Sequence, residues 1–201
     1  SPLPPLDDGN VTIDASNAGV ILDGGGSVER AIEIGSSNNS VMGLQIRNFK
    51  NDGIVIGFPS QNNQVGGDHT IGAAPSGQGN ALTGCGNGIR LLFTSNNQIK
   101  GNFIGTNATG TAAGTINTIG IVIGSESYNN HVGGLTPGER NIVSGNERGI
   151  DVADASAQFN IIAGNYVGTD VTGSYAIPNS SGIVLETGAR NNVVGGTTPS
   201  E

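Results

Sequence analysis

The stretch Asn-Gln-Ile-Lys-Gly-Asn-Phe-Ile-Gly-Thr at residues 97–106 decides the fold, because a close copy of it follows later in the chain. It returns as Asn-Ile-Ile-Ala-Gly-Asn-Tyr-Val-Gly-Thr at residues 160–169, which is 63 positions further on. A second stretch, Asn-Asn-Gln-Val-Gly-Gly at residues 62–67, has counterparts at residues 129–134 and 191–196. Two kinds of repeat therefore alternate, and such self-similarity indicates a solenoid rather than an ordinary globule.

A shorter motif, Gly-Ile-x-apolar, marks the repeat along most of the chain. It begins at Gly53, Gly88, Gly120, Gly149 and Gly182, after an earlier copy at Ala31 that lacks the glycine. The intervals between successive copies are 22, 35, 32, 29 and 33 residues, counted from Ala31 onward. We interpret one interval as one coil of the solenoid.

Each interval holds about three short apolar runs separated by Gly/Asn turns, as at residues 150–152, 160–162 and 166–167. Runs of this length are too short for helices and are typical of buried strands. One coil alone cannot cover its apolar face, whereas stacking at about 4.8 Å per coil buries it. The sequence therefore predicts an all-β fold, a single-stranded parallel β-helix of about six to seven coils. The strong preference of parallel crossovers predicts a right-handed one.

Composition supports a chain that turns often. The 201 residues include 35 glycines and 24 asparagines, with no tryptophan and eight other aromatic residues. Glycine and asparagine tolerate positive φ and close tight turns. Disorder would also suit a Gly-rich chain with few aromatics, but the regular Ile/Val runs argue against it.

The repeat covers nearly the whole chain, so we expect residues 1–201 to be a single β-helix domain or fragment. Residues 1–30, which are Pro-rich at the start and less repetitive, are expected to form an N-terminal cap and first coil, and residues 31–201 the repeated coils. Residues 196–201 match residues 134–139, and the chain stops where the counterpart of Arg140 is due. This mid-coil end predicts truncation of a longer chain, because solenoids normally end in an atypical cap.

Charge and cysteine content exclude several classes of partner. The formal net charge is −8, from 8 basic and 16 acidic residues, and no basic cluster is available to hold a phosphate backbone. We therefore expect no nucleic-acid partner. A single cysteine rules out an internal disulfide, and no stretch approaches the ~20 apolar residues of a membrane span.

These coils resemble the parallel β-helix repeats of the pectate-lyase-like superfamily. The Asn-x-Ile-x-Gly-Asn-x-Ile-Gly-Thr block is similar to a bacterial subfamily of large extracellular repeat proteins of unknown activity. The resemblance covers the chain from Val11 onward. It implies an extracellular or cell-surface location, and it leaves activity open because the superfamily includes lyases, hydrolases, epimerases and adhesins.

Two carboxylates are the candidate catalytic residues. On the Gly-Ile strand the side chains expected to point outward read Glu33, Val55, Arg90, Val122, Asp151 and Val184. Glu186 lies one coil above Asp151 and two residues along, so their Cβ atoms should be about 8 Å apart. That distance falls within the roughly 6.5–9.5 Å between the carboxyl groups of inverting glycosidases. Chance pairing and a solvated face explain the same residues, since charges alternate with valine and glycine.

Asparagines recur at the start of matching strands and are interpreted as structural. Stacked amides can hydrogen-bond from coil to coil, as they do in cross-β stacks. The residues concerned are Asn63, Asn97, Asn130, Asn160 and Asn192.

No cofactor is expected, although the loops at residues 105–110 and 168–173 could offer oxygen ligands to calcium. Asp170 is the weak calcium candidate, since it is the single carboxylate in the two loops. Turns of the Asx and Thr type explain both loops more simply. His69 and His131 are isolated, and Cys85 lacks the context of a nucleophile, so a buried inert thiol is expected.

The sequence favours a non-enzymatic secreted or cell-surface scaffold or adhesion-type module, with a polysaccharide or a cell-surface protein as the expected kind of partner. A polysaccharide-active enzyme, either a lyase or an inverting glycoside hydrolase, is the alternative. A second alternative is a module that assembles end to end through an exposed terminal coil, because an uncovered strand edge invites pairing.

Overall fold

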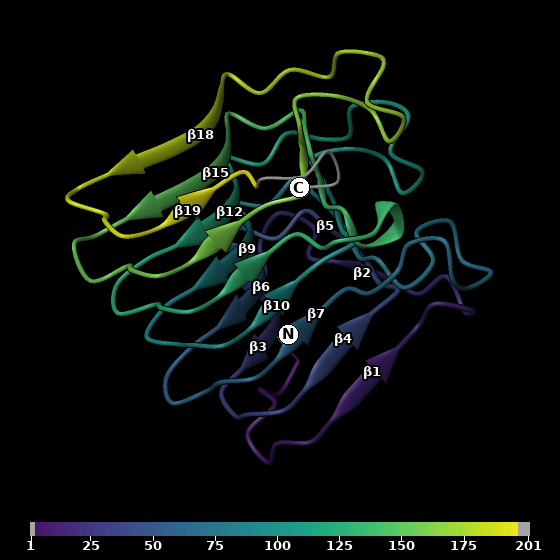
Figure 1. Ribbon diagram of the computed structural model, residues 1–201. Helices are drawn as coiled ribbons and strands as arrows, with labels where there is room; N and C mark the ends of the chain where they lie inside the picture. Colours follow the sequence, from purple (N-terminus) through teal and green to yellow (C-terminus); the bar gives the residue numbers. More distant parts are fainter. Residues whose placement is uncertain (1–2, 197–201) are drawn as a thin grey trace.

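The computed structural model describes residues 3–196, and nearly all of its regular structure is β-strand. Its strands stack from the N-terminal to the C-terminal end of the molecule, so that neighbours in a sheet come from successive repeats (Figure 1). The expected all-β fold of stacked parallel strands is thereby confirmed. The expected unfinished coil at residues 197–201 lies outside the described residues.

Three parallel sheets form the sides of the stack, and the chain passes from one to the next in a fixed order. We call them sheets A, B and C. Sheet A contains β3 (Arg30–Ile34), β6 (Asp52–Ile56), β9 (Asn87–Leu91), β12 (Ile119–Ile123), β15 (Arg148–Ala153) and β18 (Ser181–Glu186). Sheet B contains β1 (Thr12–Asp14), β4 (Ser40–Met42), β7 (Gln64–Val65), β10 (Gln98–Ile99), β13 (His131–Val132), β16 (Ile161–Ile162) and β19 (Val193–Val194). Sheet C contains β2 (Ile21–Asp23), β5 (Gln45–Arg47), β8 (Ala81–Thr83), β11 (Phe103–Ile104), β14 (Ile142–Val143) and β17 (Tyr166–Val167).

The register of sheet A follows the Gly-Ile motif. The isoleucine of each copy pairs with the isoleucine of the next. These residues are Ile32, Ile54, Ile89, Ile121, Ile150 and Ile183. The first five are at most 4% exposed, and side chains from sheets B and C join them in one core. A slip of one residue would turn every isoleucine to the outside, so burial fixes the register.

Helical structure is confined to one short 3₁₀ turn, η1 (Pro137–Glu139), in the part of the chain that the structure describes. Within residues 3–196, no helix is both long and apolar enough to span a bilayer. Near the N-terminal end, Leu6 forms a parallel bridge with Ile34, so the chain before β1 lies along the edge of β3.

Each of the three corners of the stack contains a buried ladder of asparagines. The ladder before sheet B contains the five asparagines expected from the sequence and one more, Asn39. In a typical step, Asn97 Oδ1 accepts hydrogen bonds from the backbone N–H of Asn63 at 2.9 Å and from its Nδ2 at 3.2 Å. The amides therefore satisfy, turn after turn, backbone groups that the sheets leave unpaired.

The two further ladders were not expected. One precedes the strands of sheet C and the other those of sheet A. The first contains Asn80, Asn102, Asn141 and Asn165, and the second contains Asn117, Asn146 and Asn179, with Cys85 in the matching place on the preceding turn. Their signal was present in the Gly-Asn pairs at residues 101–102, 145–146 and 164–165.

Candidate functional site

The predicted carboxylate pair lies on adjacent strands of sheet A, in the predicted register. Asp151 of β15 pairs with Val184 of β18, and Ala153 pairs with Glu186. The surroundings of the two residues differ, because Asp151 is 3% exposed whereas the Glu186 side chain is 43% exposed.

Arg148 lies between the two carboxylates and binds both of them. Its Nη1 is 2.7 Å from Asp151 Oδ2 and 2.9 Å from Glu186 Oε1. Hydrogen bonds to Asp151 and then to Glu186 raise the pKa of the Arg148 guanidinium above its ordinary value. In an inverting hydrolase the two carboxyl groups face a water and a leaving-group oxygen instead. The arrangement here is that of an ion-pair network on the sheet surface.

A second charged cluster, not anticipated from the sequence, lies on the same face of sheet A. Asp52 of β6 is fully buried and accepts hydrogen bonds from Arg90 Nη2 at 2.7 Å and Asn87 Nδ2 at 2.9 Å. Arg30 Nε approaches the same carboxylate at 3.5 Å, while Arg30 Nη1 binds Glu33 at 2.8 Å. A buried carboxylate that is paired and hydrogen-bonded in this way is typical of structure.

The outward rank of sheet A is less exposed than the sequence suggested. Val55 is 6% exposed and Asp151 is 3% exposed, although both point away from the core ladder. Val55 pairs with Glu33 on one side and Arg90 on the other, and these long side chains cover the small residue between them.

Asp170, the calcium candidate, organises its own loop. Its Oδ1 accepts hydrogen bonds from the backbone N–H groups of Ser174 at 3.0 Å and Tyr175 at 3.2 Å, and from Thr172 Oγ1 at 2.8 Å. Burial would raise the pKa of Asp170, but hydrogen bonds from Thr172, Tyr175 and Ser174 outweigh it and leave the pKa below its ordinary value.

The other loop of this type is built in the same way, which supports a turn-forming role. Asn107 Oδ1 accepts the backbone N–H of Thr111 at 2.9 Å and lies 3.2 Å from Thr109 Oγ1. An amide thus replaces the carboxylate in the same kind of loop. Over residues 3–196, no group of three or more His, Cys, Asp or Glu side chains is placed to hold a metal ion.

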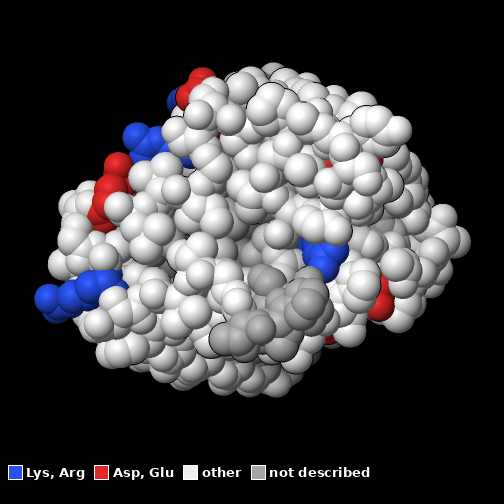
Figure 2. Space-filling model, turned by 45° about the horizontal axis from the view of Figure 1, so that its top comes forward, with Lys and Arg blue, Asp and Glu red and all other residues white. Residues whose placement is uncertain are grey.

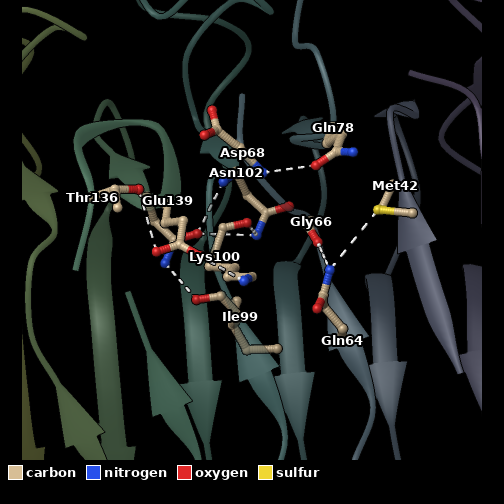
Figure 3. A network of polar contacts seen from close by, with 11 residues as sticks. Met42, Gln64, Gly66, Asp68, Gln78, Ile99, Lys100, Asn102, Thr136 and Glu139 are labelled. Carbon is tan, nitrogen blue, oxygen red and sulfur yellow. Dashed lines mark hydrogen bonds and ion pairs between the residues drawn. The ribbon is translucent and has the colours of Figure 1, made fainter. Parts of the chain in front are cut away.

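A polar network connects η1 to sheet B (Figure 3). Lys100 Nζ lies 2.7 Å from Glu139 Oε1, and Thr136 Oγ1 lies 3.3 Å from Glu139 Oε2. The hydrogen bond from Lys100 is the main reason that the pKa of Glu139 lies below its ordinary value. His131 lies beside this network, and burial lowers its pKa. These contacts fasten a loop to the stack.

Cys85 packs in the core inside the stack, whereas His69 packs on the outer face of sheet C, where Phe103 belongs to a second, smaller apolar cluster. Cys85 is 3% exposed, and burial raises the pKa of its thiol to about 11, so the unreactive thiol form dominates at neutral pH. His69 stacks on Phe103 with ring centroids 5.2 Å apart, and burial lowers its pKa.

Exposed aromatic side chains gather on one corner, between sheets A and B. The turns at residues 57–62, 92–96, 124–129 and 153–159 each carry one exposed aromatic residue. We call Phe58, Phe93, Tyr128 and Phe159 the aromatic corner; their exposed fractions are 78, 46, 47 and 56%. Phe58, Phe93 and Tyr128 border one shallow hollow of about 150 Å³.

Stacked parallel sheets and amide ladders together define the class of protein as a parallel β-solenoid. Comparison with protein-family models, with curated proteins and with solved structures finds no match to this chain. The pectate-lyase-like superfamily therefore stays a prediction from the repeat.

Proposed function

We propose that the chain is a non-enzymatic scaffold or adhesion-type module of a secreted or cell-surface protein, and that it presents a surface on which a polysaccharide or a partner protein binds. As part of this proposal it winds as a right-handed parallel β-helix of six to seven coils. The observation that carries the proposal is the sharing of Arg148 by both candidate catalytic carboxylates, at 2.7 and 2.9 Å.

The rest of the stack supports the proposed scaffold function. Sheets A, B and C are fixed by buried amide ladders at all three corners, so successive turns are locked in one register. The charged side chains of sheet A occur in ion-paired groups. Figure 2 shows a face on which charged side chains are few and gather mostly along one edge. A rigid, weakly charged surface suits display and binding.

Product analysis tests this proposal. We expect neutral and acidic polysaccharides incubated with the protein, with and without calcium, to keep their chain length in size-resolved chromatography. The physical reason is that Arg148 holds one oxygen of each candidate carboxylate in an ion pair. Shortened products that disappear in Asp151→Asn or Glu186→Gln, with Tyr175→Ala as the control, would overturn the proposal and favour the enzyme.

One observation favours the enzyme as the second candidate. Asp151 Oδ1 is buried and has no hydrogen-bond partner among the described residues. A buried polar atom without a partner requires an explanation, and a catalytic role is one such explanation. The lyase or inverting hydrolase therefore stays the alternative that the product analysis addresses.

End-to-end assembly is the other alternative. β17, β18 and β19 lie at the outer edges of their sheets in the described part of the chain, and Leu185 and Val193 are 47 and 53% exposed there. An open strand edge with apolar side chains can pair with a second copy. Growth of light scattering with concentration would favour this alternative over a monomeric scaffold.

A further inference from the structure

We propose that the aromatic corner is a binding site for a neutral polysaccharide chain. This inference deepens the proposed scaffold function by naming the site and the class of ligand. The first observation is the placement of the rings, because half of the chain's eight aromatic residues are exposed here, one on each of four successive turns. Clustered exposed apolar groups mark interaction sites more often than scattered ones do.

Two of the rings occupy backbone positions that are unusual for phenylalanine. Phe159 has φ of +57° in a place where Asn62, Asn96 and Asn129 stand on the preceding turns, with φ between +54° and +58°. Phe93 has φ of +56°. Such a conformation costs a bulky residue about 1–2 kcal/mol. Core packing does not explain why these two phenylalanines adopt a positive φ, since both rings are about half exposed or more.

The polar groups between the rings suit hydroxyl-rich ligands. One rank of backbone bridges crosses the corner from turn to turn, and its members are Gln61, Ser95, Tyr128, Gln158 and Arg190. The exposed amides of Asn62, Asn96 and Asn129 lie next to this rank. Amide and hydroxyl groups donate and accept hydrogen bonds, as sugar hydroxyls require. A purely apolar surface for protein docking would not need polar groups between its aromatic rings.

Charge selects a neutral ligand over an acidic one. The four turns carry two acidic residues, Glu126 and Asp154, and no lysine or arginine. A polyanion would meet like charge on these four turns, and the nearest cation in the rank of bridges is Arg190 on the following turn. This point also disfavours nucleic acid, which the net charge of −8 disfavours as well.

The repeat of the site suits a polymer. Successive turns of a parallel stack are about 4.8 Å apart, close to the length of one sugar residue in an extended chain. The face of an aromatic ring is electron-rich and attracts the polarised C–H groups on one side of a sugar ring. Phe58 and Phe93 come just after β6 and β9, whereas Tyr128 and Phe159 come just before β13 and β16, so the rings run obliquely across the corner. A polysaccharide crossing the turns in the same oblique direction would therefore meet one ring per turn.

Affinity electrophoresis tests the inference. The protein is run in native gels containing a soluble β-glucan, a xylan or a galactomannan, with polygalacturonate and phosphatidylcholine vesicles as competing probes. We expect at least one neutral polysaccharide to retard the wild-type protein. Each of Phe58→Ala and Phe159→Asn should weaken the binding about tenfold, the size expected for loss of one stacking ring. Tyr175→Ala, which removes a ring that is 73% exposed elsewhere, should leave it unchanged.

Phe159→Asn also separates binding from folding. Asparagine already stands at this place on other turns, so the variant should melt no earlier than the wild type while it loses affinity. Binding that is unchanged in both variants, binding only to polygalacturonate or vesicles, or no retardation by any neutral polysaccharide would overturn the inference. None of these results would show whether the protein cleaves polysaccharides. The scaffold proposal would therefore still be tested separately, by product analysis.

Discussion

Replacing Gly133 with alanine is expected to lower the free energy of unfolding by at least about 4 kcal/mol, a loss that only a few mechanisms produce. Gly133 follows β13 at φ of +114°, a conformation that side chains rarely adopt. A Cβ there would overlap the carbonyl oxygen of Ala163 and lie 2.9 Å from both Ala163 C and Asn165 Nδ2. These are atoms of the next turn, so the backbone stack itself would have to open. Urea unfolding followed by circular dichroism measures the loss.

Gly195→Ala is the matched control for this substitution. Gly195 occupies the corresponding place after β19, with φ of +83°, and no described heavy atom lies within 4 Å of an added Cβ. Only the backbone penalty applies, about 1–2 kcal/mol. Equal losses for the two variants would contradict the close stacking of successive turns.

Replacing Asn97 with alanine is the second substitution with a large expected effect. Its Oδ1 accepts hydrogen bonds from the backbone N–H and the Nδ2 of Asn63, and its Nδ2 donates to Asn130 Oδ1 at 2.8 Å and Thr94 Oγ1 at 2.9 Å. All four residues are buried. Two buried donors on Asn63 would lose their acceptor, at about 1–3 kcal/mol each, so we expect a loss of about 3 kcal/mol.

Gln98→Ala provides the control on the adjacent residue. Gln98 points outward from β10 and is exposed, so its truncation should change the free energy of unfolding by less than about 0.5 kcal/mol. Chemical unfolding of both variants under the same conditions makes the comparison. If Asn97→Ala were as mild as Gln98→Ala, the ladder would not be a source of stability.

Much of sheet A could be predicted from the sequence, because the motif places a glycine where successive strands approach closely and an isoleucine on the buried side. A Cβ added to Gly120, for example, would lie 2.6 Å from the carbonyl oxygen of Gly149 on the next strand. The rank from Glu33 to Val184 pairs residue by residue as the motif indicates. Periodicity locates strands well here, since each run is short and bounded by turn-forming residues.

The position of the arginines was harder to predict. The spacing placed Asp151 and Glu186 near one another, but it did not show that Arg148, three residues before Asp151, would turn its side chain between them. Long side chains have many rotamers, and the choice among them depends on neighbours across two strands. Sequence spacing alone therefore overstates how open such a carboxylate pair is.

The aromatic corner was missed for a related reason. The eight aromatic residues are visible in the sequence, but Phe49 and Phe103 are buried whereas Phe93 and Phe159 are exposed. What decides this for Phe93 and Phe159 is a turn with positive φ, which directs the side chain away from the core. Asparagine stands at the matching place on the other turns. Its single replacement by phenylalanine at residue 159 is the sequence signal that indicates the aromatic corner.

Every function argued for this chain requires that successive turns stack in one register, with the amide ladders closed. Hydrogen exchange followed by two-dimensional NMR tests this most directly at the backbone N–H groups of Asn63, Asn97 and Asn130. Each donates to the side-chain oxygen of the next ladder member, at 2.9–3.0 Å. We predict that these amides are among the slowest to exchange, with the N–H of Thr111 in the exposed loop exchanging far faster. Exchange of the three ladder amides as fast as that of Thr111 would contradict the stacked solenoid.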